Sequence, residues 1–137
     1  MITLTGDTKL NIETLRYDHF AAEWMADFCF DWRLIGSLYL CDAISMAIQE
    51  GEAFLERSFT KDILPSIAKR RQTTWRAAER SMRYAIESAW LRAFPEILTL
   101  YFPQDFEKTG RPSVSQFVRV IGWEAHQDWC AKNVTLD

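Results

Sequence analysis

Apolar residues at helical spacing constrain the fold of this 137-residue chain more than any other feature. The clearest example lies in residues 75–93, where one row of side chains along the predicted helix is apolar and another is charged. The apolar row contains Ala78, Met82, Ile86 and Ala89, and the charged row contains Arg76, Glu79, Arg80, Arg83 and Glu87. One side of such a helix packs on a core, and the other faces water or an anion.

Similar spacing predicts helices over most of the remaining chain. The expected helices span residues 13–28, 32–50, a segment starting near 59 or 60, 96–102 and 114–133. Asp31 is the expected N-cap of the second helix, in which Leu38 lies on the apolar stripe and Asp42 falls away from it. Pro65 predicts that the third helix begins late or is kinked. No strand is required, so the sequence predicts an all-α fold of about six helices.

The length and the 48% hydrophobic content are those of a single packed domain. We expect residues 18–137 to form it, with a helix-turn-helix at about residues 60–90. Residues 1–17 are an N-terminal arm or short extra element, and residues 1–11 favour either a hairpin or a disordered arm. Residues 103–112, with two prolines and a glycine, predict a loop.

The cysteines and the hydropathy pattern bear on the compartment. Cys29, Cys41 and Cys130 form no CxxC pair, so the sequence indicates neither a disulfide framework nor a zinc site. No leader opens the chain, and polar residues interrupt its most apolar run well short of a membrane span. We therefore expect a cytoplasmic protein with no membrane contact.

Positive charge is concentrated in the segment KRRQTTWRAAERSMR, residues 69–83. It holds six basic residues and one acid, a formal charge of +5, whereas the whole chain sums to −3 and the remainder therefore to −8. Acidic surfaces repel nucleic acid, so an interaction with DNA would be confined to this face. Such a distribution favours specific docking over general coating.

Within this segment, two predicted helices joined by a short polar turn form a helix-turn-helix arrangement, whose second helix fits the major groove of double-stranded DNA. Arginine matches the acceptors of guanine, and a carboxylate can accept from cytosine. The candidate base contacts are Arg76, Glu79, Arg80 and Arg83. The candidate phosphate contacts, which position the domain without reading sequence, are Lys69, Arg70, Arg71, Thr73 and Thr74. Both threonines are also candidate N-caps of the second helix.

A second interpretation of the charged row needs no DNA. A charged helix face is commonly just solvated, and Glu79 with Arg83 is a favourable intrahelical pair. Other chemistry has little support, because neither His19 nor His126 has ligand spacing around it and no nucleotide-binding or nucleophile motif occurs. We expect no enzyme activity, catalytic residue, metal or cofactor.

The quoted segments also carry a family resemblance. The runs IGSLYLCDAISM (35–46), TKDILPSIAKRRQTTWRAAERSMRYAIESAW (60–90) and RPSVSQF (111–117) resemble the C-terminal DNA-binding effector domain of the stage-zero sporulation master regulator of endospore-forming bacteria. The resemblance implies a six-helix DNA-binding domain that reads bases through Glu79, Arg80 and Arg83. It extends from about residue 18 to 129.

This chain departs from the family's pattern at several positions. Gln72 stands where the family usually has Asn, and a glutamine tolerates a left-handed backbone less readily. Trp75 and Arg76 replace small residues at the start of the recognition helix, and about two residues are inserted in 51–58. Residues 1–17 cannot encode the receiver domain that the family regulator carries.

Together, these features predict a sequence-specific DNA-binding transcriptional regulator that acts as a stand-alone domain. By the family's pattern, two copies would occupy adjacent sites as a homodimer on DNA, through the C-terminal helices, with RNA polymerase or a regulator protein as a further partner. The alternative is a protein-interaction module that pairs with or antagonises a full-length regulator or another partner.

Overall fold

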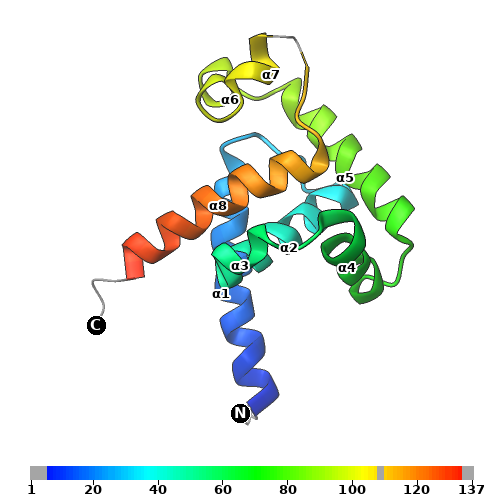
Figure 1. Ribbon diagram of the computed structural model, residues 1–137, viewed down its shortest axis with the longest axis vertical. Helices are drawn as coiled ribbons and strands as arrows, with labels where there is room; N and C mark the ends of the chain where they lie inside the picture. The colour runs from blue at the N-terminus through cyan, green and yellow to red at the C-terminus, as the bar shows by residue number, and fades with distance from the viewer. Residues whose placement is uncertain (1–5, 108–109, 134–137) are drawn as a thin grey trace.

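The computed structural model describes residues 6–107 and 110–133. Within them every regular element is a helix, which confirms the all-α prediction (Figure 1). These are α1 (Gly6–Ala26), α2 (Ile35–Glu50), α3 (Glu52–Leu55), the π-helical turn η1 (Phe59–Ile63), α4 (Leu64–Arg70), α5 (Trp75–Trp90), α6 (Pro95–Tyr101), α7 (Pro103–Glu107) and α8 (Val114–Asn133). Helices α3 and α7 are short additions to the elements expected from the sequence.

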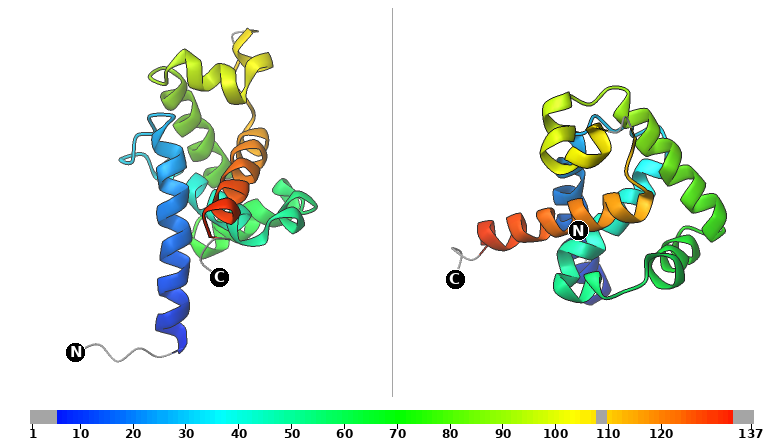
Figure 2. Two further views of the ribbon diagram at one scale, coloured as in Figure 1. Left: turned by 90° about the vertical axis from the view of Figure 1, so that its left-hand side faces the viewer. Right: turned by 45° about the horizontal axis from the view of Figure 1, so that its top comes forward.

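Helix α2 lies at the centre of the fold and packs against α1, α5 and α8 (Figures 1 and 2). Because neighbours surround it, its buried residues are not confined to one stripe. The prediction that Asp42 lies away from the core is wrong, since its side chain is only 3% exposed. Conversely, Leu38 of the expected apolar stripe is 38% exposed. Periodicity identified the helix but not how much of its circumference is covered.

The start of α2 differs from the prediction. Its N-cap is Leu34 rather than Asp31, and Leu34 makes no side-chain capping bond. The Asp31 carboxylate instead accepts the backbone N–H of Arg33 and pairs with its guanidinium. The bonds from Arg33 lower the pKa of Asp31 to about 2. Asp31 still supports the helix start through its carbonyl, which accepts from the Ser37 hydroxyl at 2.7 Å.

The two long terminal helices meet outside this centre. Helix α1 begins at Gly6, so the hairpin and the disordered arm predicted for residues 1–11 are wrong for 6–11, and residues 1–5 lie outside the described residues. The indole N–H of Trp24 donates to Asp128 at 2.9 Å, and Trp129 packs on Tyr17 and Phe20. Beyond these contacts both helices extend past the body of the molecule (Figure 2). Helix α8 has the bounds that the sequence predicted.

A cluster of four aromatic rings forms part of the core. Phe28, Trp90, Phe102 and Phe117 lie with ring centroids between 5.5 and 6.3 Å apart, a spacing typical of stable aromatic pairs. Phe102 is buried between α6 and α7. The prediction of a loop throughout 103–112 is wrong for 103–107, because α7 occupies them. No helix among the described residues is long and apolar enough to cross a membrane.

Candidate nucleic-acid interface

Helices α4 and α5 form the predicted pair joined by a short polar turn. Pro65 occupies the first turn of α4, where its missing N–H costs no helical hydrogen bond. The π-helical turn η1 precedes it, with the N–H groups of Asp62 and Ile63 both donating to the carbonyl of Ser58. The prediction of a late start or a kink at Pro65 therefore corresponds to an α-helix that starts at Leu64.

The chain leaves α4 through a Schellman motif, the helix ending in which two N–H groups beyond the cap bond back to carbonyls of the last turn. Gln72 N–H donates to the carbonyl of Lys69 at 3.3 Å, and Thr73 N–H donates to that of Ala68 at 2.9 Å. This motif requires a left-handed residue, usually glycine. Gln72 fills that position with φ of 58°, so the turn holds a side chain where glycine is preferred.

Thr74 begins α5 directly after this turn. Its hydroxyl oxygen accepts the backbone N–H of Ala77 at 3.1 Å, and its extended backbone is that of an N-cap residue. The N-cap prediction is thus confirmed for Thr74. Thr73 is half-buried, and its N–H belongs to the Schellman motif. The two threonines have different structural roles, although the sequence suggested the same one for both.

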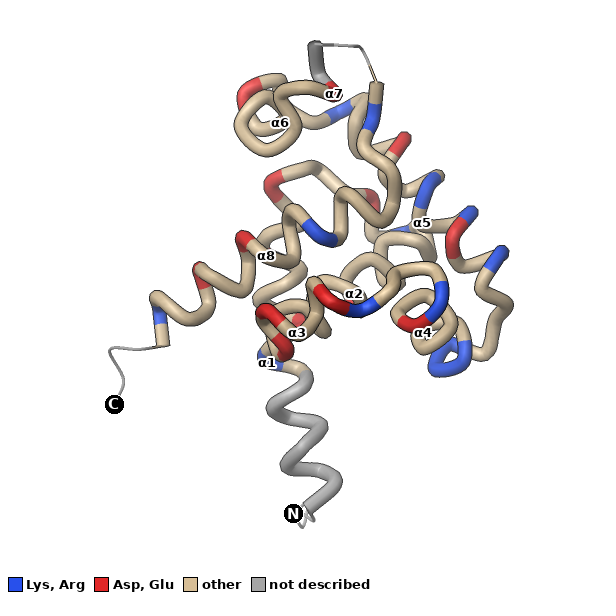
Figure 3. Tube along the Cα trace, viewed as in Figure 1, with Lys and Arg blue, Asp and Glu red and all other residues tan. Residues whose placement is uncertain are grey.

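Helix α5 has the two faces that the sequence predicted. The apolar row Ala78, Met82, Ile86 and Ala89 is buried, together with Ala85. Arg76, Arg80 and Arg83 are exposed on the other side, with Glu79 and Glu87 at intermediate exposure. Figure 3 shows these charges along the outer side of α5, close to the basic end of α4. Three arginines therefore share the accessible face of the second helix.

Several charged groups of this face already have partners within the protein. Arg83 donates to Glu79 at 2.8 Å, which is the intrahelical pair anticipated as an alternative to DNA contact. The Arg76 guanidinium lies 5.1 Å from the ring centroid of its neighbour Trp75, within the range of a cation–π contact. Arg111, which lies just before α8, donates to Glu87 at 3.2 Å.

A hollow flanks α5 on each side. The larger, of about 490 Å³, runs between Glu79, Arg83 and Glu87 and the segment that begins α8. The smaller, of about 270 Å³, lies between Arg80, Ser81 and Tyr84 and the start of α2. The outer face of α5 therefore lies between two hollows.

The candidate phosphate contacts differ in their surroundings. Lys69 and Arg70 are exposed at the end of α4. Arg71 instead donates from Nε and Nη2 to the two carboxylate oxygens of Asp42, both at 2.7 Å. These bonds raise the pKa of Arg71. All three residues are thus exposed, but Arg71 is also bonded to a buried carboxylate of α2.

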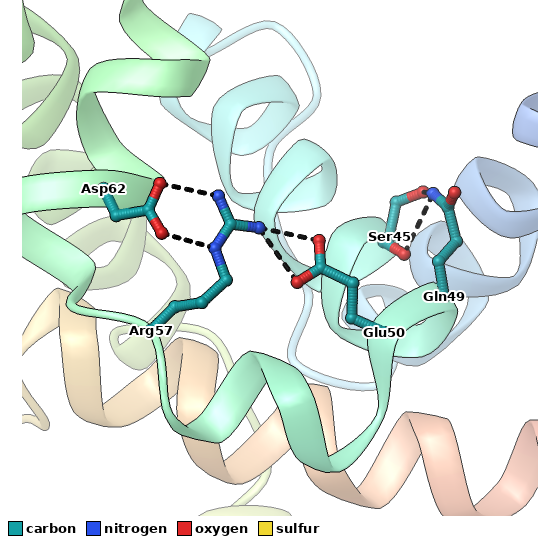
Figure 4. A network of polar contacts seen from close by, with 5 residues as sticks. All are labelled: Ser45, Gln49, Glu50, Arg57 and Asp62. Carbon is teal, nitrogen blue, oxygen red and sulfur yellow. Dashed lines mark hydrogen bonds and ion pairs between the residues drawn. The ribbon is translucent and has the colours of Figure 1, made fainter.

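A second ion-pair network holds η1 against the end of α2 (Figure 4). Arg57 donates to both oxygens of Glu50, at the end of α2, and to both oxygens of Asp62 in η1, over distances of 2.6 to 2.9 Å. These bonds raise the pKa of Arg57 and lower that of Asp62. Arg119 of α8 braces the same connection by donating to the carbonyls of Leu55 and Arg57.

Sequence reasoning missed three residues of this region: Asp42, Arg57 and Arg111. Asp42 had a recognisable signal, since it is an acid inside the most apolar run of the chain. A buried acid needs a cation, and the basic segment supplies Arg71. Arg57 and Arg111 lie in irregular segments, where no periodic pattern shows what a side chain contacts.

The two histidines and the cysteines remain outside this interface. His19 pairs with Glu23 at 2.9 Å on α1, and His126 Nδ1 bonds with the carbonyl of Ile48 at 2.7 Å. The cysteines carry free thiols. Across residues 6–107 and 110–133 we find no cluster of three or more His, Cys, Asp or Glu residues that could hold a metal ion.

The comparison with protein families agrees with this geometry. Residues 22–124, about three quarters of the chain, match the family described as "Sporulation initiation factor Spo0A C terminal". The matched segment includes the whole of α2 to α7, and therefore both helices of the pair and the turn between them. The first part of α1 and the last part of α8 lie outside it. The chain thus belongs to the Spo0A C-terminal family of DNA-binding effector domains.

Proposed function

We propose that this protein is a transcriptional regulator that binds double-stranded DNA in a sequence-specific manner, with α5 in the major groove. The observation that supports this most is the outer face of α5, where three exposed arginines stand above a buried apolar row, directly after a capped turn. A helix fits the width of the major groove, and the side chains of its first half reach the base edges.

The candidate residues fall into two groups, those that would contact bases and those that would contact phosphates. Arg80 and Arg83 read guanine through their bidentate forks, and Glu79 accepts from cytosine or orients Arg83, to which it is already bonded. Arg76, held over Trp75, contributes at the edge of the site. Lys69, Arg70 and the two threonines of the turn, Thr73 and Thr74, hold phosphates and set the register. A homodimer on adjacent sites, through the C-terminal helices, completes the proposal.

A protein partner is proposed for the far end of α5. Leu91, Phe94 and Leu100 are 88%, 65% and 66% exposed around the α5–α6 connection. Large exposed apolar side chains close together in sequence are a candidate interaction site, because contiguous apolar patches mark such sites. A regulator contacts RNA polymerase or another regulator through such a surface, and the same surface supports the alternative function of a pure protein-interaction module.

Selection of bound sites from a random duplex pool tests DNA recognition, and fluorescence titration of the selected duplex at several salt concentrations measures it. Arg83→Ala should weaken binding by about 1–3 kcal/mol and relax specificity at one base pair. Lys69→Ala should weaken all duplexes alike and lower the salt slope by about 0.9. Equal losses for Arg83→Ala on every sequence would reassign Arg83 to phosphate. No enrichment and no duplex binding, with a tight complex to a protein, would favour the interaction module.

A further inference from the structure

The pair between Arg71 and Asp42 has the geometry of a structural anchor. Two parallel bonds of 2.7 Å join the guanidinium to the carboxylate in the bidentate arrangement, which is among the strongest side-chain contacts in proteins. The Asp42 side chain is 3% exposed, whereas that of Arg71 is 37% exposed. The anchor therefore has one end in the core and the other at the surface of the DNA-binding turn.

The place where Arg71 joins the chain gives this anchor its effect. Arg71 is the C-cap of α4 and directly precedes the left-handed Gln72. A non-glycine residue in that conformation persists only where its surroundings fix it. The two backbone bonds of the Schellman motif fix it from one side, and the tie from Arg71 to the centre of α2 fixes it from the other. The direction in which α5 leaves the turn thus depends on this tie.

The electrostatics oppose any release of Arg71 to a phosphate. Removal of the guanidinium would leave the Asp42 carboxylate buried without its counter-ion, which is strongly unfavourable. The carboxylate of Asp18, in the part of α1 outside the family match, also favours the charged form of Arg71 and adds to its raised pKa. Lys69 and Arg70 directly precede Arg71, and both side chains are exposed to solvent.

We propose that Arg71 is a positioning residue of the DNA-binding turn, and that Asp42 and Arg71 act as one unit that fixes the orientation of α5. Arg71 therefore leaves the set of phosphate contacts to which its charge and place in the sequence had assigned it. The inference rests on the proposed DNA binding, because orientation matters through the base contacts of Arg80 and Arg83. It adds two residues to the determinants of specificity, neither of which touches DNA.

The test measures fluorescence anisotropy of the duplex that wild-type protein selects from the random pool, and of a duplex of unrelated sequence, over a range of salt. The variants are Asp42→Asn, Arg71→Met and Arg71→Lys, with Arg70→Met as the matched control. Asp42→Asn is the decisive variant, because it keeps every basic group and removes only the negative charge that holds Arg71.

If the pair positions α5, all three variants of the unit should weaken binding to the selected duplex at least about fivefold, since one misplaced bidentate base contact corresponds to that much or more. The salt slope should stay unchanged for Arg71→Met and fall by about 0.9 for Arg70→Met. The reverse pattern, in which Arg71→Met lowers the slope and Asp42→Asn binds as tightly as wild type, would show that Arg71 holds a phosphate and overturn the inference.

Two further measurements distinguish a loss of positioning from a loss of folding and from a failure of the proposed DNA binding. The double variant Asp42→Leu/Arg71→Met replaces the buried pair by apolar groups, an exchange that proteins commonly tolerate, so it should fold and still bind the selected duplex weakly with an unchanged slope. Without any duplex present, hydrogen exchange at the Gln72 and Thr73 amides should become faster in the single variants of Asp42 and of Arg71. Unchanged exchange would refute positioning even if the protein bound no DNA at all.

Discussion

Substitution of Gly36 by alanine should destabilise the protein more than its small size suggests. Gly36 lies in the first turn of α2, where this helix crosses α5. A Cβ atom there would lie 1.9 Å from the carbonyl oxygen of Ser81 and 2.8 Å from the amide nitrogen of Met82. Both are backbone atoms inside a helix, so no side-chain rotation relieves the clash.

The size of the effect follows from this distance. An ordinary contact begins at 3.4 Å, so the two helices must separate by about 1.5 Å at the crossing. Overpacking of a core costs about 1–3 kcal/mol, and separation also loosens the buried contacts of Met82. We therefore expect a loss of about 3 kcal/mol in the free energy of unfolding, and a Tm lower by about 10 °C.

Urea and thermal unfolding followed by circular dichroism measure this difference, with Gly110→Ala as the control. Among the described residues, a Cβ at Gly110 would meet only the carbonyl oxygen of Asp105, at 3.8 Å, so alanine should change stability by less than about 0.5 kcal/mol. If Gly36→Ala also falls within that limit, α2 and α5 do not approach as closely as described. Because Ser81 lies between Arg80 and Arg83, the variant should also bind the selected duplex more weakly.

Four other outcomes follow from the turn and the thiols. Gln72→Gly should stabilise the protein by about 0.5–1 kcal/mol in urea unfolding, because it relieves a left-handed glutamine, and a loss of stability would contradict that conformation. Thr74→Ala should cost about 1 kcal/mol through loss of the cap, and an unchanged midpoint would remove this role. At pH 8, iodoacetamide should label the exposed Cys130 before the buried Cys41, as read by mass spectrometry. Burial raises the pKa of the Cys41 thiol from 9.0 to about 12. The protonated thiol therefore contributes its full stability below pH 9, and this contribution is lost as pH rises towards 12. Cys41→Ala should remove this pH dependence from the unfolding curves.

The features predictable from the sequence are those that depend on local spacing. The apolar row of α5 fixed its two faces, and the bounds of α8 followed from its pattern alone. Thr74 could be recognised as a cap because capping involves residues only three positions apart. For the same reason the Glu79 and Arg83 pair could be anticipated.

The features that escaped prediction depend on residues distant in sequence. Asp42 and Arg71 are 29 positions apart, and only the packing of α4 on the central helix brings them together. The charge pattern predicted a phosphate contact for Arg71, but it could not show that Arg71 also pairs with the buried Asp42. The length of α1 also escaped prediction, because the polar residues of its first turns carry no apolar pattern.

If Arg83 reads a base as proposed, Glu79 competes with that base for the same guanidinium, because the two side chains already form an ion pair. A duplex must offer Arg83 a better partner than Glu79 before that side chain changes partner. The acceptors of a correctly placed guanine can do so, whereas a mismatched edge leaves the arginine with its carboxylate. Under the proposed function, Glu79 would therefore weaken the binding of Arg83 to every sequence and be displaced only by the correct one, so that discrimination between sequences improves while affinity falls.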